Sequence, residues 1–178
     1  MKAGDQEPNS LDRLAKLVRA KNDADLAIAE LIGRPCLPGN IGEYIAAHVF
    51  GIQLMQSGAH PGYDGLFRED TLAGKTVNIK TYSRQEYVLD ISPHPCDYYL
   101  VLAGPPGQAR IRPWVIDAVH LLEREPLLAT LRERGVKIGV ASSVQKAVWD
   151  SARIFPPGPT VPYHLSDRQQ HLLSLFSV

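Results

Sequence analysis

Residues 75–82, KTVNIKTY, carry the clearest strand signal in the chain. Val77 and Ile79 alternate with Asn78 and Lys80 along this segment. Successive side chains of a strand point to opposite faces of its sheet, so a period of two predicts a strand. We therefore expect the Asn78 and Lys80 side chains to point to one face and the apolar side chains to the other.

A second strand decides the fold class. Tyr98–Ala103, YYLVLA, is an apolar run bounded by turn residues, which is typical of a buried central strand. The turn-rich segment 60–65, HPGYDG, leads into a short strand at residues 66–67. Further strands are expected at residues 87–91, 114–122 and 137–140.

Helical patterns lie before and after these strands. Ser10 can cap a first helix, Asn22 or Asp23 a second that ends at Gly33, and Asn40 a third over 41–50. Later helices are expected at residues 126–134, from 142 or 143 to about 154, and from the capping-box pattern at Ser166 onward. The order predicts a mixed α/β domain with N-terminal helices and a peripheral C-terminal helix.

The domain division follows from composition. Residues 1–9 are polar and predict a disordered tail, residues 10–155 a single domain, and residues 156–178 a proline-rich linker with a C-terminal helix. A chain of 178 residues with 44% hydrophobic and 21% charged residues is typical of a globular domain.

The charge balance and the cysteine content further limit the class of protein and its expected location. Nineteen basic residues balance nineteen acidic ones, which excludes a histone-like basic protein but not a local nucleic-acid site. The two cysteines, Cys36 and Cys96, are too few for a disulfide framework and favour a reducing cytoplasm. We find neither a secretory signal nor an apolar run long enough for a membrane helix, so we expect a cytoplasmic protein without a membrane partner.

Four residues between positions 43 and 80 suggest chemistry. Asp64 lies where a turn enters a strand, Asn78 and Lys80 share a face of the next strand, and Glu43 lies on a helix. A hairpin would bring Asp64 beside Asn78 and Lys80, and a helix packed on the sheet would add Glu43. Oxygen ligands from Asp64 and Asn78, the Ile79 carbonyl and Glu43 through water suit Mg²⁺ or Mn²⁺. Such an ion neutralises phosphate charge and lowers the pKa of a bound water. Lys80 would polarise that water and stabilise developing negative charge.

These residues resemble a known superfamily. The segments GNIGEYIAA (39–47), PGYDGLF (61–67), GKTVNIKTY (74–82) and CDYYLVLAGP (96–105) are similar to bacterial proteins of the PD-(D/E)XK nuclease superfamily. The resemblance covers about residues 33–155. It implies a restriction-endonuclease-like fold, with a mixed central sheet flanked by helices. It also implies metal-dependent hydrolysis of nucleic acid, in which Glu43, Asp64 and Lys80 match the catalytic pattern.

Asn78 departs from that pattern, which has Asp, Glu or Gln at this position. An Asn keeps a carbonyl oxygen but loses the charge, so a weaker metal site is expected. A carboxylate from elsewhere could substitute, and Asp90 is the candidate.

Each assignment has a structural alternative. Glu43 forms a capping-box pattern with Asn40, Asp64 is also a common turn residue, and Lys80 could be a solvated lysine facing an edge. Lys75, Tyr82 and Arg84 could line a nucleic-acid groove or simply be solvated.

Three classes of function are therefore open. The first is a nuclease acting on DNA. The second is a nuclease-fold module, weakened or inactive, that binds nucleic acid or a protein. The third is an interaction protein that dimerises through its C-terminal helix.

Overall fold

The computed structural model describes residues 8–56, 61–107, 114–158 and 163–177. Two compact units divide the chain, residues 1–41 and residues 42–178, and each is described by itself. The helices are α1 (Pro8–Ile32), α2 (Pro38–Phe50), a 3₁₀ turn η1 (Asp70–Leu72), α3 (Arg124–Glu133), α4 (Lys146–Ala152) and α5 (Asp167–Ser174). The strands are β1 (Ile52–Leu54), β2 (Gly65–Phe67), β3 (Thr76–Tyr82), β4 (Val88–Leu89), β5 (Tyr98–Ala103), β6 (Ala118–Glu123), β7 (Ser142–Ser143) and β8 (Arg153–Phe155).

The first unit contains one long helix where the sequence predicted two. Asn22 and Asp23 lie inside α1 and do not cap a second helix. Four alanines between positions 20 and 29 are strong helix formers, and an i,i+4 ion pair joins Lys21 to Asp25 across the expected break. The helix ends before Gly33, which adopts φ 68°, so that part of the prediction is confirmed.

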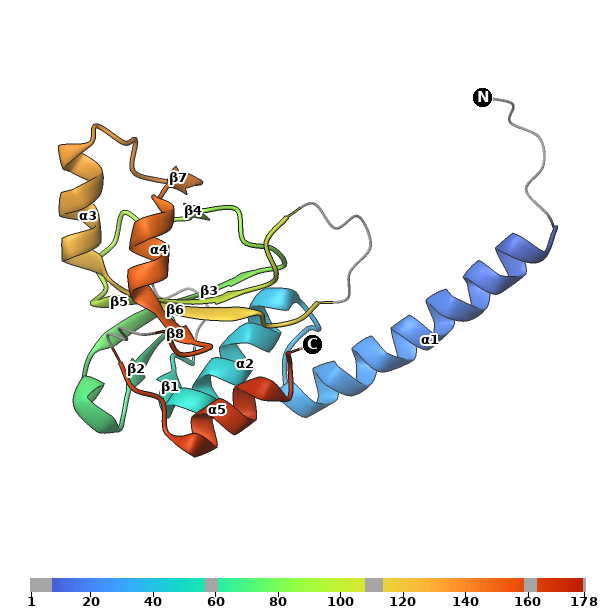
Figure 1. Cartoon of the computed structure of the whole chain (residues 1–178). Coiled ribbons are helices and arrows are strands. Elements are labelled where there is room, and N and C mark those ends of the chain that lie inside the picture. The colour runs from blue at the N-terminus through green and yellow to red at the C-terminus, as the bar shows by residue number, and fades with distance from the viewer. Residues whose placement is uncertain (1–7, 57–60, 108–113, 159–162, 178) are drawn as a thin grey trace, which may run out of the picture. The chain divides into compact units, whose positions relative to one another are not determined.

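The second unit is built on a six-stranded sheet in the order β1-β2-β3-β5-β6-β8 (Figure 1). β3 and β5 are parallel and the other pairs are antiparallel. The structure thus confirms a mixed α/β fold. Parallel neighbours need a crossover, and here residues 83–97 supply one without a helix. This crossover carries β4, which pairs with β7 in a separate two-stranded sheet.

The two faces of the large sheet are covered differently. α3 and α4 lie on one side and α2 and α5 on the other (Figure 1). Tyr99 and Val101 of β5 belong to a buried cluster with side chains from α3 and α4. The register pairs Asn78 with Tyr99 and Lys80 with Val101, so Asn78 and Lys80 share the face of α3 and α4.

Several predicted boundaries are wrong. α2 begins at Pro38, and the predicted strand at 137–140 is replaced by β7 at Ser142–Ser143. Two strands were not expected, β1 and β8. The helix predicted to reach residue 154 ends at Ala152 because Ile154 and Phe155 are buried in β8, where pairing with β6 outweighs helical propensity.

The C-terminal helix begins as predicted. Ser166 caps α5 with a complete capping box to Gln169, which is buried together with Leu173. The Ile116 amide donates to the Phe176 carbonyl at 2.9 Å. α5 is therefore packed on the sheet unit. Of the predicted disordered tail, residues 1–7 lie outside the described residues. The prediction is wrong for Pro8 and Asn9, which belong to α1.

A buried histidine predicts pH-dependent stability. Burial lowers the pKa of His120 to about 4, although a hydrogen bond from its Nδ1 to the Trp149 carbonyl at 2.9 Å opposes the shift. In the unfolded state His120 has its ordinary pKa of 6.5. Between pH 6.5 and pH 4 the unfolded chain therefore binds more protons at this residue than the folded chain does. The contribution of His120 to the free energy of unfolding should therefore be fully present above pH 6.5. It should fall by about 3 kcal/mol as the pH drops toward 4.

Urea unfolding at several pH values measures this loss. The His120→Gln variant should show a flatter pH profile, whereas the exposed control His164→Gln should keep the steep one. A wild-type profile that is flat between pH 6.5 and 4.5 would contradict the assignment.

Candidate functional site

Asp64 is held in the sheet by its backbone. Its amide donates to the Val77 carbonyl at 2.8 Å, and its carbonyl accepts from the Met55 amide at 2.9 Å. Its side-chain Oδ2 also accepts from the Ile79 amide at 2.6 Å. The Asp64 carboxylate is thus fixed against β3 at the residue between Asn78 and Lys80, as the sequence predicted.

Asn78 is buried, with 7% of its surface exposed, and its two polar atoms differ in environment. Nδ2 donates to the Gly62 carbonyl at 3.0 Å. Oδ1 is buried without a hydrogen-bond partner among the described residues. Buried acceptors are nearly always satisfied, so an orphaned oxygen at this position is suited to a ligand. Because Gly65 pairs with Val77, Asp64 is opposite Asn78 in the same register.

Lys80 is half-buried and lies on the same face as Asn78. β3 lies between β2 and β5 in the strand order, so it is not an edge strand along its whole length. However, the β2 ladder covers only Thr76 and Val77, whereas the β5 ladder continues to Tyr82. At Lys80, β3 is therefore paired with β5 alone.

Glu43 is carried by an element on the other face. Its capping-box alternative is wrong, because α2 begins two residues before Asn40, whose side chain donates to the Pro35 carbonyl at 2.8 Å. The neighbouring Gly42 abuts Thr81, such that a Cβ at Gly42 would lie 1.9 Å from Thr81 Oγ1. Thr81 alternates with Lys80, so α2 packs against the face opposite the Lys80 side chain. The structure thus brings Asp64, Asn78 and Lys80 to one strand, and Glu43 to a helix across it.

The three candidate nucleic-acid residues are spread along β3. Lys75 precedes the strand and lies 3.5 Å from Asp97 Oδ1, while Arg84 follows it and pairs with Glu86. The seven residues of β3 place the two ends of the strand about 20 Å apart. Tyr82 packs against the core cluster, and its hydroxyl accepts from the Asp90 amide at 2.9 Å. Burial raises the pKa of Tyr82 to about 12, as expected for a phenol packed against the core cluster.

Asp90 has a structural partner as well. Its Oδ1 accepts from the Ala141 amide at 2.8 Å, at a residue with φ 54°. This carboxylate links the crossover to the segment before β7. Nothing in the sequence pattern indicated that bond, because its two residues are 51 positions apart.

The donor set fits a hard cation only in part. Asp64 supplies one carboxylate and Asn78 one buried, orphaned carbonyl oxygen, and oxygen donors are what Mg²⁺ and Mn²⁺ prefer. Across the described ranges, no cluster of three or more His, Cys, Asp or Glu side chains could hold a metal. A cation at this position would therefore rely on one charged ligand and on water.

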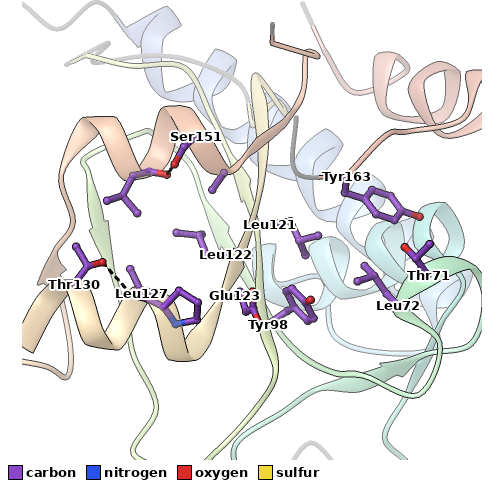
Figure 2. A pocket seen from close by; sticks show the side chains of 13 residues that line it. Thr71, Leu72, Tyr98, Leu121, Leu122, Glu123, Leu127, Thr130, Ser151 and Tyr163 are labelled. Carbon is purple, nitrogen blue, oxygen red and sulfur yellow. Dashed lines mark hydrogen bonds between the residues drawn. The ribbon is translucent and has the colours of Figure 1, made fainter. Parts of the chain in front are cut away.

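A separate cavity of about 580 Å³ lies beside β6, lined by residues of α3 and α4 and by Tyr98 and Tyr163 (Figure 2). Tyr98, Glu123, Thr130, Ser151 and Tyr163 give it hydroxyl and carboxylate groups around buried leucines. None of the sequence-predicted site residues lines this cavity, and no Lys, Arg or His does. Its chemistry does not suit phosphate.

The comparisons with known proteins add no relative. No family model matches the sequence, and no curated protein matches it. Among the described helices, none is long and apolar enough to span a membrane. The functional interpretation therefore depends on the Asp64–Asn78–Lys80 arrangement itself.

Proposed function

We propose that this chain is a metal-dependent nuclease of the PD-(D/E)XK type that hydrolyses phosphodiester bonds, with DNA as its substrate. The 2.6 Å hydrogen bond from the Ile79 amide to Asp64 Oδ2 carries the proposal, because it fixes a carboxylate against the Asn78-x-Lys80 segment. The mixed sheet with helices on both sides supports the restriction-endonuclease-like fold that the sequence resemblance implies.

Each residue has a distinct task in this proposal. Asp64 and the Asn78 carbonyl oxygen hold Mg²⁺ or Mn²⁺, which when bound neutralises phosphate charge and acidifies water. Asp64 is positioned for this task by the Ile79 amide, and Asn78 by its bond to the Gly62 carbonyl. Lys80 stabilises the negative charge that develops on the phosphate. Glu43, carried by α2 against the opposite face of β3, has no part in this set.

Cleavage assays test the proposal directly. Purified protein with Mg²⁺ or Mn²⁺ should cut DNA, and Lys80→Ala should lower the rate by about 100-fold or more, as for the loss of one group that stabilises developing charge. Lys137→Ala, an exposed lysine distant in sequence from β3, is the matched control and should leave the rate unchanged. Failure to cut single- or double-stranded DNA or RNA, or full activity of Lys80→Ala, would overturn the proposal.

Asn78 favours a second candidate function, a nuclease-fold module that binds nucleic acid without turnover. Asn78 supplies no charge, and its Nδ2 is already committed to Gly62, so Asp64 is the one carboxylate fixed against this segment by a described contact. This alternative predicts binding that weakens steeply with salt while the nucleic acid stays intact. Fluorescence anisotropy on the same DNA, run beside the cleavage assay, separates the two functions.

A further inference from the structure

The α1 helix has an exposed apolar stripe over its N-terminal half. Leu11, Leu14, Leu17 and Val18 are between 45% and 66% exposed. An isolated helix gains little stability in water unless an apolar face is packed. Exposed apolar surface of this extent marks a contact site.

The stripe continues along the helix with a coiled-coil period. Positions 11, 14, 18, 21, 25, 28 and 32 alternate in steps of three and four, as in a heptad seam. They hold Leu and Val in the first half, Lys21 and Asp25 in the middle, and Ile28 and Ile32 at the end. The two isoleucines are half-buried and keep exposed surface for a partner.

The charges of α1 are divided between its halves. Residues 10–21 carry four basic side chains and one acidic, whereas residues 22–32 carry three acidic and no basic ones. The first turn holds no acidic residue and the last turn no basic one. This order opposes the helix macrodipole, which favours acidic residues near the N-terminus and basic ones near the C-terminus. The charge pattern therefore does not stabilise α1 as an isolated helix.

We propose that α1 pairs with α1 of a second copy of this chain, antiparallel and centred on Asp23. In this register Leu14 is level with Ile32 of the second copy, and Val18 with Ile28. Lys21 is level with Asp25, which exchanges the ion pair within one helix for one between helices. Every apolar seam position from 14 to 32 then meets an apolar one, and the basic half of each helix lies along the acidic half of the other.

The charges exclude the competing arrangements of the same stripe. A parallel pair places basic beside basic and acidic beside acidic halves. A short antiparallel overlap of the exposed N-terminal halves alone also places basic beside basic. Only the full antiparallel overlap pairs apolar seam positions with apolar ones and also places the basic half of each helix along the acidic half of the other. This surface is distinct from α5, which is packed on the sheet unit by Gln169, Leu173 and the bond to Phe176.

Sedimentation of the full chain tests the seam. The wild type should form a concentration-dependent dimer, and Leu14→Asp with Val18→Asp should raise its dissociation constant by about 100-fold or more. The matched control, Ala20→Asp with Ala27→Asp, places the same charges on exposed positions opposite the seam and should still dimerise. A monomeric wild type, including one that instead binds anionic phospholipid vesicles through its basic half, would overturn the proposal. So would a seam variant that remains a dimer.

Charge reversal tests the orientation and guards against simple unfolding of α1. Arg13→Glu, Lys16→Glu and Lys21→Glu together should abolish dimerisation, because both halves are then acidic. Adding Asp23→Lys, Asp25→Lys and Glu30→Lys to this chain restores opposite halves and should restore the dimer. Restoration would show that the triple variant had lost complementarity rather than its fold. Failure of the six-residue variant to dimerise, with helicity by circular dichroism retained, would overturn the antiparallel register.

Discussion

Replacing Asp64 with asparagine should abolish cleavage while leaving the fold nearly intact. Asparagine keeps an oxygen that can accept from the Ile79 amide, so the 2.6 Å contact has a substitute. It lacks the negative charge that a divalent cation requires of its single carboxylate ligand. We expect a loss of cleavage of about 100-fold or more, since even groups that only support metal ligands change affinity or activity by 10- to 100-fold.

The Asp64→Ala variant measures the contribution of Asp64 to stability, separately from its contribution to cleavage. It removes both the charge and the acceptor, and the Ile79 amide then loses a charge-assisted bond. Because Asp64 is half-buried and water can partly replace the carboxylate, we expect a loss of about 1–2 kcal/mol in the free energy of unfolding. Asp64→Asn should lose less than about 1 kcal/mol.

Cleavage rates and urea unfolding midpoints of both variants measure these effects. Asp150→Asn is the matched control, since Asp150 is exposed on α4, where it pairs with Lys146. Wild-type cleavage by Asp64→Asn would leave Asp64 with a purely structural role. An equal loss of stability in both variants would show that the charge, and not the acceptor, holds β3.

The sheet could be predicted where one local pattern decides the structure. The Tyr98–Ala103 strand matches its predicted bounds because both faces of β5 are buried, so its apolar run is continuous. β3 was predicted within one residue because its pattern alternates. β1 and β8 were missed because three-residue strands have too few residues for a period, and β8 is also defined by pairing with β6, which is distant in sequence.

Some features of the candidate site could likewise be predicted from local sequence patterns, and others could not. The shared face of Asn78 and Lys80 follows from strand geometry, and the hairpin to Asp64 from the turn-rich segment before it. The orphaned Asn78 Oδ1 could not be predicted, because it depends on which way the amide turns toward Gly62. The position of α2 across the sheet from Lys80 also depends on tertiary packing, at Gly42 and Thr81.

Gly42→Ala should be strongly destabilising, although alanine is the better helix former. At an open helical position this substitution gains up to about 1 kcal/mol. At Gly42 the new Cβ would lie 1.9 Å from Thr81 Oγ1 and 3.1 Å from Thr81 Cβ, so α2 or β3 must move. Overpacking of this kind costs about 1–3 kcal/mol. Gly39→Ala in the same helix meets no atom within 4 Å and is the matched control, expected to be neutral or stabilising.

A double-mutant cycle with Thr81 identifies the cause of that loss. Thr81 Oγ1 is buried without a hydrogen-bond partner in the described structure, so Thr81→Ala removes no bond there and frees the space that the Gly42→Ala methyl needs. The double variant should regain about 1 kcal/mol or more relative to Gly42→Ala, measured as the urea midpoint at unchanged m. Thr81→Val, which replaces the hydroxyl with a methyl group of similar size, should give no rescue. Equal rescue by Ala and Val would mean that lost polarity, and not the close contact of α2 with β3, sets the stability of this junction.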